Sequence, residues 1–274
     1  MEIGHLSGIV LSILLSTTII SCGADSTAEE ISNEAIDALQ IVKEKRIFFG
    51  HQSVGTDILQ GIEELARETV NNIKIVELDD NSKSTEADII EASIGRNVYP
   101  DEKIYDFAHI MRSGIAEDVD IAFMKFCYID SNSDMTEDEI VESYINEMEN
   151  LEKEFPHVTF IYFTMPLEAD RNDFSSIIKR IPYKILNKPI YYRERNVKRN
   201  NFNDLLIAAK GDTGRVFDLA KFESTNPDGK AETFGYKGRR IRVLVPMYTD
   251  DGGHLNQIGR RYVAEQLLLF LSQF

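Results

Sequence analysis

Two short segments near opposite ends of the chain contain the side chains that acyl transfer by a serine requires. The first is GHQSVG at residues 50–55, in which Ser53 follows an apolar run and precedes a helical pattern. The second is YTDDGGHLN at residues 248–256, in which Asp251 stands three positions before His254. A serine hydroxyl becomes a nucleophile when a histidine removes its proton, and a carboxylate orients that histidine. The sequence therefore predicts a catalytic triad, provided that the two segments meet in space.

The position of Ser53 suits this chemistry. At a strand-to-helix turn, the N–H of Ser53 belongs to the unsatisfied first turn of the helix and can receive a developing oxyanion. The short spacing between Asp251 and His254 lets the carboxylate accept from one ring nitrogen while the other nitrogen faces Ser53. The G-x-S-x-G pentapeptide of α/β-hydrolases is absent, because the spacing here is G-x-x-S-x-G.

The elements that must position these segments alternate along the chain. Apolar runs rich in Val, Ile and Phe have no polar alternation, as expected for strands buried on both faces; they are residues 46–49, 73–78, 119–126, 158–165 and 216–219. Helical patterns cover residues 54–66, 104–111, 136–155 and the stretch from 256 onwards. This order predicts an α/β fold of about five parallel strands flanked by helices, with the site beyond the carboxyl ends of the strands. Residues 222–247 are predicted to be a long loop or a β-hairpin leading to the histidine segment.

The combination of motifs and element order resembles the SGNH (GDSL-type) hydrolase superfamily. In that superfamily an early serine after the first strand acts with a late D-x-x-H on a three-layer, flavodoxin-like α/β fold. The resemblance covers residues 45–274 in the order of the elements, and its specific motifs are the two end segments. It implies that Ser53 is the nucleophile and one oxyanion donor, that His254 is the base and that Asp251 is the orienting acid. It implies no cofactor and no metal.

The two inner motifs of the superfamily, a glycine and an asparagine that complete the oxyanion hole, are matched less closely. Gly95, with Asn97 beside it, is the counterpart of the glycine. Where G-x-N-D is expected after the third predicted strand, the chain has KFCYID at residues 125–130, with no asparagine in register. Asn97, or a polar group around Tyr128, is the candidate for the missing donor. The usual Gly-Asp before the serine is replaced by HQ at residues 51–52. Losing one oxyanion donor costs about 3–4 kcal/mol of transition-state stabilisation.

Several of these side chains have alternative interpretations. A serine before a helix often serves only as its N-cap. A metal site formed by His51, Asp130, Asp251 and His254 is a second alternative, but no paired-histidine helical spacing supports it. Cys127 is interpreted as packed core rather than as a second nucleophile.

The first 22 residues are typical of an export signal. Residues 6–20 are largely apolar and rather short for a membrane span. They lead into IISCG at residues 19–23, which resembles the lipobox of bacterial lipoproteins, where the cysteine (here Cys22) is lipidated and becomes the new N-terminus. An uncleaved signal anchor is the alternative, because no Lys or Arg precedes the apolar run. Residues 23–44 are predicted to be an acidic tether and a leading helix, followed by the hydrolase-like domain at 45–274.

The net charge of −16 argues against nucleic acid as a partner, because phosphate binding needs clustered Lys and Arg. Two short basic clusters, residues 193–199 and 237–242, are interpreted as solvated faces. The expected location is the bacterial cell envelope, with lipid at Cys22 holding the protein to the membrane.

The function expected from the motifs and the resemblance is a metal-independent serine esterase outside the cytoplasm. It would remove small acyl groups, acetyl above all, from a small-molecule or glycan ester through an acyl-enzyme. Two alternatives stay open. One is an acyltransferase that uses the same site to acylate glycan hydroxyls. The other is a non-catalytic lipoprotein of the same fold that binds a glycan or a protein.

Overall fold

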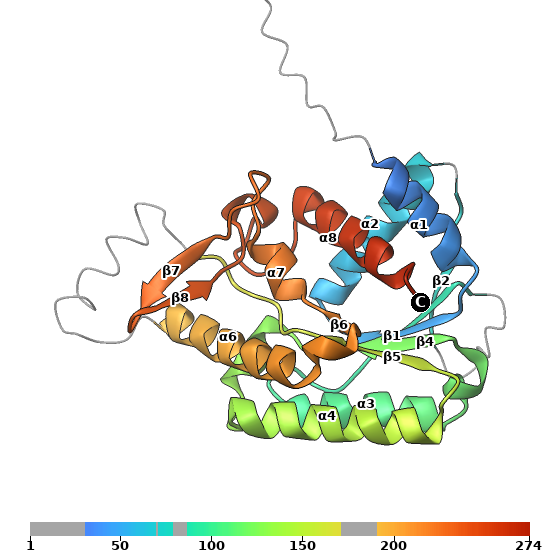
Figure 1. Cartoon of the computed structure of the whole chain (residues 1–274), viewed down its shortest axis with the longest axis horizontal. Coiled ribbons are helices and arrows are strands. Elements are labelled where there is room, and N and C mark those ends of the chain that lie inside the picture. Colours follow the sequence, from blue (N-terminus) through green and yellow to red (C-terminus); the bar gives the residue numbers. More distant parts are fainter. Residues whose placement is uncertain (1–30, 70, 79–86, 171–190) are drawn as a thin grey trace, which may run out of the picture. The chain divides into compact units, whose positions relative to one another are not determined.

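A computed structural model describes residues 31–69, 71–78, 87–170 and 191–274, which form one compact unit beginning at Ile31. Six parallel strands make a sheet in the order β2-β3-β1-β4-β5-β6 (Figure 1). The strands of this sheet are β1 (Ile47–His51), β2 (Ile75–Glu77), β3 (Ile89–Ser93), β4 (Ile121–Met124), β5 (Thr159–Phe163) and β6 (Val216–Phe217). A separate antiparallel hairpin consists of β7 (Thr233–Tyr236) and β8 (Arg239–Arg242).

Helices cover both faces of the sheet. The α-helices are α1 (Asn33–Lys43), α2 (Val54–Glu68), α3 (Pro100–Arg112), α4 (Glu137–Glu154), α6 (Tyr191–Lys210), α7 (Leu219–Ser224) and α8 (Gln257–Leu271). Short 3-10 helices are η1 (Ile115–Asp118), η2 (Tyr128–Asn132), η3 (Gly211–Thr213) and η4 (Pro246–Tyr248). None of the described helices has the length and apolar character needed to span a bilayer.

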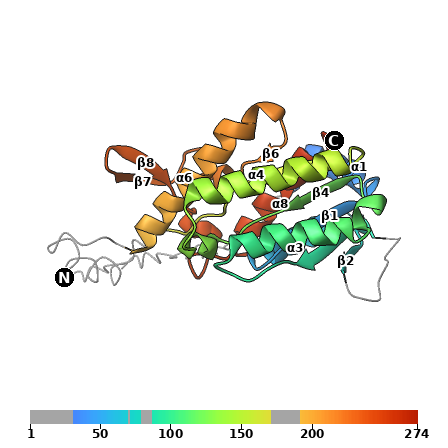
Figure 2. The same cartoon turned by 90° about the horizontal axis from the view of Figure 1, so that it is seen from below.

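The sheet separates two apolar cores because successive side chains of a strand point to opposite faces. On β1, Phe49 packs into the core formed with α1, α2, α7 and α8. Its neighbour Phe48 packs into the core formed with α3, α4 and α6, where it stacks on Phe107. Figure 2 shows α3 and α4 side by side on this second face. β1 is therefore the central, fully buried strand that delivers the following residues to the carboxyl edge of the sheet.

The predicted α/β class with a parallel sheet is confirmed, and each of the five predicted runs contains a strand. The sequence missed β3, whose short apolar pair Ile89 and Ile90 is followed by Glu91 and then by the exposed Ser93. This strand pairs with β1 on one side and β2 on the other. Without the edge strand β2, the order is the 2-1-3-4-5 order of flavodoxin-like sheets.

Two helices next to the sheet begin as the sequence predicts. α4 has a capping box, in which Thr136 Oγ1 accepts the Glu139 N–H at 3.3 Å and the Glu139 carboxylate accepts the Thr136 N–H at 2.7 Å. α8 begins after Asn256, whose side chain accepts the N–H of Gly259 at 3.1 Å.

One interpretation of the sequence needs correction. The basic cluster at residues 193–199 is not a solvated face, because it lies on α6 with Arg199 fully buried against Glu168. α1, the leading helix expected before residue 45, packs against α8 through Ala38, Leu39 and Val42. The predicted hairpin within residues 222–247 is confirmed as β7 and β8. Cys22 lies outside the described residues.

Candidate active site

Ser53 occupies the turn between β1 and α2 in a strained conformation. Its φ of 52° and ψ of −104° fall in a region that residues with a side chain rarely adopt. It stands at the N-cap position of α2, yet its side chain makes no capping hydrogen bond. Instead, its Oγ lies 2.6 Å from Nε2 of His254. The interpretation of Ser53 as a simple helix cap is therefore wrong, and the strained turn presents its hydroxyl to the histidine.

Asp251 holds the other side of the His254 ring. Its Oδ2 lies 2.6 Å from Nδ1 of His254, and its Oδ1 accepts the N–H groups of Gly253 and His254, each at 2.8 Å. Burial acts to raise the pKa of Asp251, but these hydrogen bonds outweigh it and hold the pKa well below its usual range. An ionised Asp251 accepts from Nδ1–H, which leaves Nε2 free to accept the proton of Ser53.

The two segments meet because α2 and α8 pack closely against each other. A side chain at Gly61 would place its Cβ 2.4 Å from the carbonyl oxygen of Arg260, so glycine permits the contact. Arg260 in turn pairs with Glu64. Nearer the site, Oδ2 of Asp57 on the first turn of α2 accepts the N–H of Leu255 at 3.1 Å. Asp57 therefore ties the helix that follows the serine to the loop that carries the histidine, and burial raises its pKa.

Tyr128 forms a wall beside the base. Its ring meets the ring of His254 edge to face, with centroids 5.6 Å apart and planes at 81°. A Cβ on Gly253 would lie 2.7 Å from Cζ of Tyr128, so only glycine lets the loop pass this close to the ring. The main-chain oxygen of Tyr128 accepts from Nε of buried Arg199 at 2.7 Å. The ring of Tyr128 therefore packs against both His254 and the loop that carries it.

The oxyanion donors inferred from the resemblance do not all lie free. Among the described residues nothing accepts the N–H of Ser53, which leaves this donor open. The N–H of Gly95 donates to Asp106 at 2.8 Å, so it does not serve as a donor in this conformation. The side chain of Asn97 directs its Oδ1 to Nζ of Lys103 at 3.0 Å. Of the predicted donors, the N–H of Gly95 is thus engaged, whereas the bond between Asn97 and Lys103 uses the amide oxygen of Asn97 and not its Nδ2 donor.

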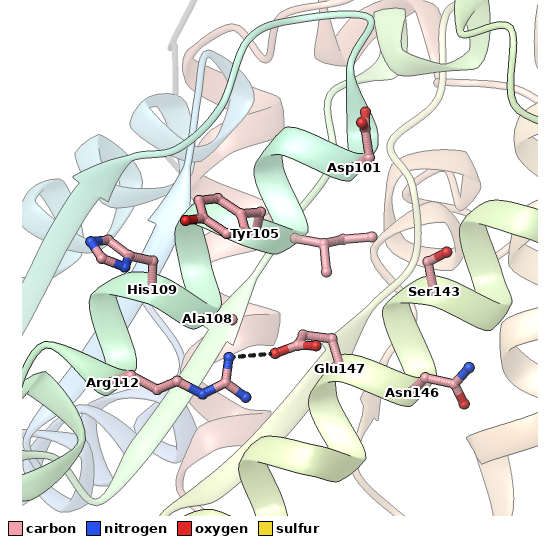
Figure 3. A pocket seen from close by; sticks show the side chains of 9 residues that line it. Asp101, Tyr105, Ala108, His109, Arg112, Ser143, Asn146 and Glu147 are labelled. Atoms are coloured by element: carbon pink, nitrogen blue, oxygen red, sulfur yellow. Dashed lines mark ion pairs between the residues drawn. The ribbon is translucent and has the colours of Figure 1, made fainter.

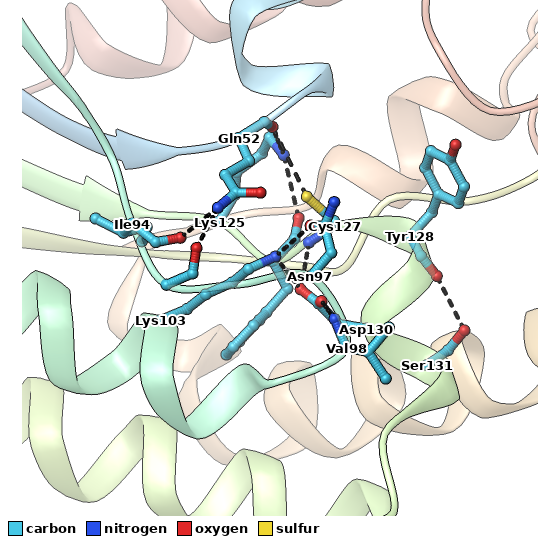
Figure 4. Close-up of polar contacts among 12 residues, drawn as sticks. Gln52, Ile94, Asn97, Val98, Lys103, Lys125, Cys127, Tyr128, Asp130 and Ser131 are labelled. Atoms are coloured by element: carbon cyan, nitrogen blue, oxygen red, sulfur yellow. Dashed lines mark hydrogen bonds and ion pairs between the residues drawn. The ribbon is translucent and has the colours of Figure 1, made fainter.

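Asp130 connects the loops around the site. Its Oδ2 accepts from Nζ of Lys103 at 2.6 Å and from the N–H of Cys127 at 2.7 Å (Figure 4). Its Oδ1 accepts the N–H of Val98 at 2.8 Å, which holds this β-branched residue at a φ of 76°. The thiol of Cys127 is buried, as the sequence predicts. Asp130 therefore fixes the loop after β4 against the loop after β3.

His51 belongs to a separate buried pair. Its Nε2 lies 2.6 Å from Oε2 of Glu91, and its ring packs so close to Gly55 that a Cβ there would lie 2.4 Å away. Burial lowers the pKa of His51, although Glu91 opposes the shift. His51 and Asp130 thus have partners of their own, away from His254. Among the described residues, no three His, Cys, Asp or Glu side chains are grouped so that they could hold a metal ion.

A groove of about 440 Å³ lies elsewhere, between α3 and α4 (Figure 3). Arg112 and Glu147 form an ion pair of 2.8 Å across it, and Tyr105 and His109 lie on its α3 side. None of the residues that line this groove belongs to the Ser53 site. Its large volume therefore does not identify it as the place of the chemistry.

Sequence reasoning missed three residues that shape the site. Lys125 is fully buried, and its signal was a lone cation at the end of the apolar run 119–126. Gln52 links the serine turn to the loop after β3, as its Nε2 donates to the main-chain oxygen of Ile94 at 2.9 Å. The sequence sign of Asp57 was its position on the predicted helix, where an acidic residue stands one turn after the serine.

No protein-family model and no curated protein matches the chain. Solved structures are similar to it at low identity. A protein assigned as a platelet activating factor from Streptococcus pneumonia is 13% identical, with a TM-score of 0.44 over 85% of this chain and 91% of that one. A protein assigned as lipolytic and of the G-D-S-L family, from Desulfitobacterium hafniense DCB-2, is 7% identical, with a TM-score of 0.45 over 82% and 99%.

A third similar structure is the periplasmic domain of a lipopolysaccharide acetyltransferase from Salmonella ser. Paratyphi A. It is 11% identical, with a TM-score of 0.40, and the match covers 80% of each chain. The activity has to be argued from the site itself.

Proposed function

We propose that the protein is a serine ester hydrolase of the SGNH type, acting on small acyl esters outside the cytoplasm. The observation that carries the proposal is the hydrogen-bonded series of Asp251, His254 and Ser53, with 2.6 Å at each of its two links. The strained backbone of Ser53 and the absence of a capping hydrogen bond from its side chain support the same conclusion. Neither feature stabilises the local fold.

The geometry supports a two-step reaction through an acyl-enzyme. Nε2 of His254 takes the proton of Ser53 as Oγ attacks the ester carbonyl, and the N–H of Ser53 donates to the oxyanion that forms. The imidazolium, stabilised by ionised Asp251, then protonates the departing alcohol. A water molecule repeats the attack with Nε2 as its base. The products are the free acid and the alcohol, and Ser53 regains its proton.

The exposure of the triad supports a large, solvated alcohol half, such as a glycan. The side chains of His254 and Asp251 are 43% and 56% exposed, so the base is accessible from the solvent side. A long acyl chain would need a buried apolar channel beside the serine, whereas an acetyl group needs little space. We therefore propose acetyl esters of carbohydrate as the substrate class.

An acyltransferase is the second candidate, and the same exposure of His254 favours it. A base that solvent reaches can also activate a sugar hydroxyl, so the acyl-enzyme could pass its acyl group to a glycan. Incubation with an aryl acetate and an added sugar distinguishes the two. Free acetate as the sole product supports hydrolysis, and acetylated sugar supports transfer.

The proposed location is the bacterial cell envelope, with the protein anchored through lipid on Cys22. The support is the sequence at residues 19–23 and the apolar run before it. Mass spectrometry of the mature protein tests this proposal. A lipid-modified cysteine at the N-terminus is expected, and an intact Met1 would point to the uncleaved signal anchor.

The catalytic proposal is tested with Ser53→Ala in an aryl acetate assay. The expected loss of kcat is at least 1,000-fold, because removing a triad nucleophile costs about three to six orders of magnitude. Ser93→Ala is a matched control, since Ser93 is exposed at the end of neighbouring β3 and pairs in register with His51. A fluorophosphonate should label Ser53 alone. A loss below tenfold in Ser53→Ala would reject the assignment of Ser53 as the nucleophile.

A further inference from the structure

Lys125 is a buried cation with an unusual set of partners. Its side chain is fully buried, and its Nζ donates to the main-chain oxygens of Gln52 at 2.8 Å and Phe126 at 3.2 Å. No described carboxylate forms an ion pair with it. The equally buried Lys103, by contrast, is paired with Asp130 at 2.6 Å. Burying a cation without a carboxylate costs free energy, so the fold alone gives no reason for a lysine here.

The oxygen that Lys125 binds belongs to the peptide unit of the serine turn. The carbonyl of Gln52 and the N–H of Ser53 are the two ends of one planar amide and point in opposite directions. A donor that holds the Gln52 oxygen therefore also sets the direction of the Ser53 N–H. Sγ of Cys127 lies 3.8 Å from the same oxygen, and the N–H of Gly55 donates to it at 3.1 Å.

The side chain of Gln52 anchors the same residue from the other end. Its Nε2 donates to the main-chain oxygens of Ile94 and Gly95 in the loop after β3 (Figure 4). Its main-chain oxygen accepts from Lys125 after β4, so Gln52 connects the two loops. Figure 4 shows the dashed contacts of Lys125 and Cys127 converging on the main chain of Gln52. The contacts of the Gln52 side chain and of Lys125 together hold the Gln52–Ser53 amide in place. They do so although the strained φ of 52° at Ser53 would favour a change in the orientation of this amide.

We propose that Lys125 is a positioning residue for the oxyanion donor, an inference that rests on the proposed function. Its Nζ holds the Gln52–Ser53 amide so that the N–H of Ser53 faces the reacting carbonyl. A donor on the carbonyl oxygen also draws electron density from the amide and strengthens its N–H as a donor. Lys125 acts from behind the peptide, in the segment after β4 where this chain has no asparagine to donate to the oxyanion directly.

Lys125→Met tests the proposal because it keeps a side chain of similar length and removes both hydrogen bonds that Nζ donates. The expected result is a 10- to 100-fold lower kcat with KM within twofold, and an equal fall in the rate of fluorophosphonate labelling. The Tm is expected to stay unchanged or to rise, since an apolar side chain replaces a buried unpaired cation. Lys125→Gln, which retains a neutral N–H donor, should recover part of the lost kcat at a similar Tm.

Lys103→Met is the matched control, because it removes an equally buried lysine whose carboxylate partner then lies unpaired. It should lower the Tm, which Lys125→Met should not. A kcat within threefold of the native value in both Lys125 variants overturns the inference. So does a Tm that falls together with kcat, because that would assign Lys125 to the fold. Full activity in Ser53→Ala would remove the proposed function itself, whereas an inactive Ser53→Ala beside fully active Lys125 variants removes only this inference.

Discussion

Replacing Glu223 by glutamine is expected to stabilise the protein at neutral pH. The Glu223 side chain is fully buried on α7, where its Oε2 accepts the N–H of Leu167 at 2.6 Å. Its Oε1 has no hydrogen-bond partner among the described residues. Burial raises the pKa of Glu223 to about 8, although the Leu167 N–H and the charges of Lys125 and Arg199 oppose the shift.

The size of the effect follows from the difference between the folded and unfolded chains. The carboxyl has a pKa of 4.5 when it is solvated, so between pH 4.5 and about 8 unfolding releases a proton and stability falls as the pH rises. At about 1.4 kcal/mol for each pH unit, the penalty is about 3 kcal/mol at pH 7 and about 5 kcal/mol above pH 8. Glutamine keeps the oxygen that accepts from Leu167 and does not ionise. The variant should therefore match the native protein below pH 4.5 and exceed its stability at pH 7.

Urea unfolding of both proteins at pH 4.5, 7 and 8.5 measures this difference. The other titrating groups are shared, so the difference between the two unfolding free energies isolates Glu223. Glu142→Gln on α4 is the control, because Glu142 is exposed and water solvates its carboxylate in both states. A free-energy difference between native and Glu223→Gln protein that does not change with pH would refute the reasoning.

Two further predictions concern the loop that carries His254. Asp57→Ala removes the acceptor of the Leu255 N–H and should lower kcat/KM about 10- to 150-fold, because a hydrogen bond to a charged group is worth about 1.5–3 kcal/mol. Asp57→Asn should lose less activity. Equal steady-state losses in the two variants would argue against a role of this hydrogen bond in holding the His254 loop. Gly253→Ala should displace His254 and lower kcat, because its Cβ would lie 2.7 Å from the Tyr128 ring. Adding Tyr128→Ala should recover part of that loss, and a double-mutant cycle without recovery would contradict the steric explanation.

The sheet could be predicted from the sequence to the extent that its strands are apolar. Runs such as residues 119–126 and 158–165 contain strands because a strand covered on both faces has no polar alternation. β3 escaped prediction because Glu91 interrupts its short run, and that side chain lies half-buried against His51 rather than in solvent. α6 escaped because its charges suggest an exposed helix, whereas Arg199 is buried and hydrogen-bonded to Tyr128 and Glu168.

The site could be predicted where the residues that contact each other belong to one short motif. Asp251 and His254 are three residues apart, so their hydrogen bond is local, and Ser53 was recognisable from its position after a strand. The oxyanion environment was not predictable, because it depends on which side chains meet across strands. The N–H of Gly95 donates to Asp106 on α3, and Lys125 reaches the serine turn from the segment that follows β4, a neighbouring strand. Such contacts depend on the register between neighbouring strands, and the amino-acid sequence does not state that register.

The hydrogen bond between Ser53 and His254 spans 201 positions of the chain, and it forms through the packing of α2 against α8. A chain still emerging from the ribosome contains Ser53 long before it contains His254. In the proposed mechanism, the Ser53 hydroxyl therefore stays unactivated during synthesis until α8 docks and brings His254 to it. Under the proposed function, turnover therefore reports on completion of the fold.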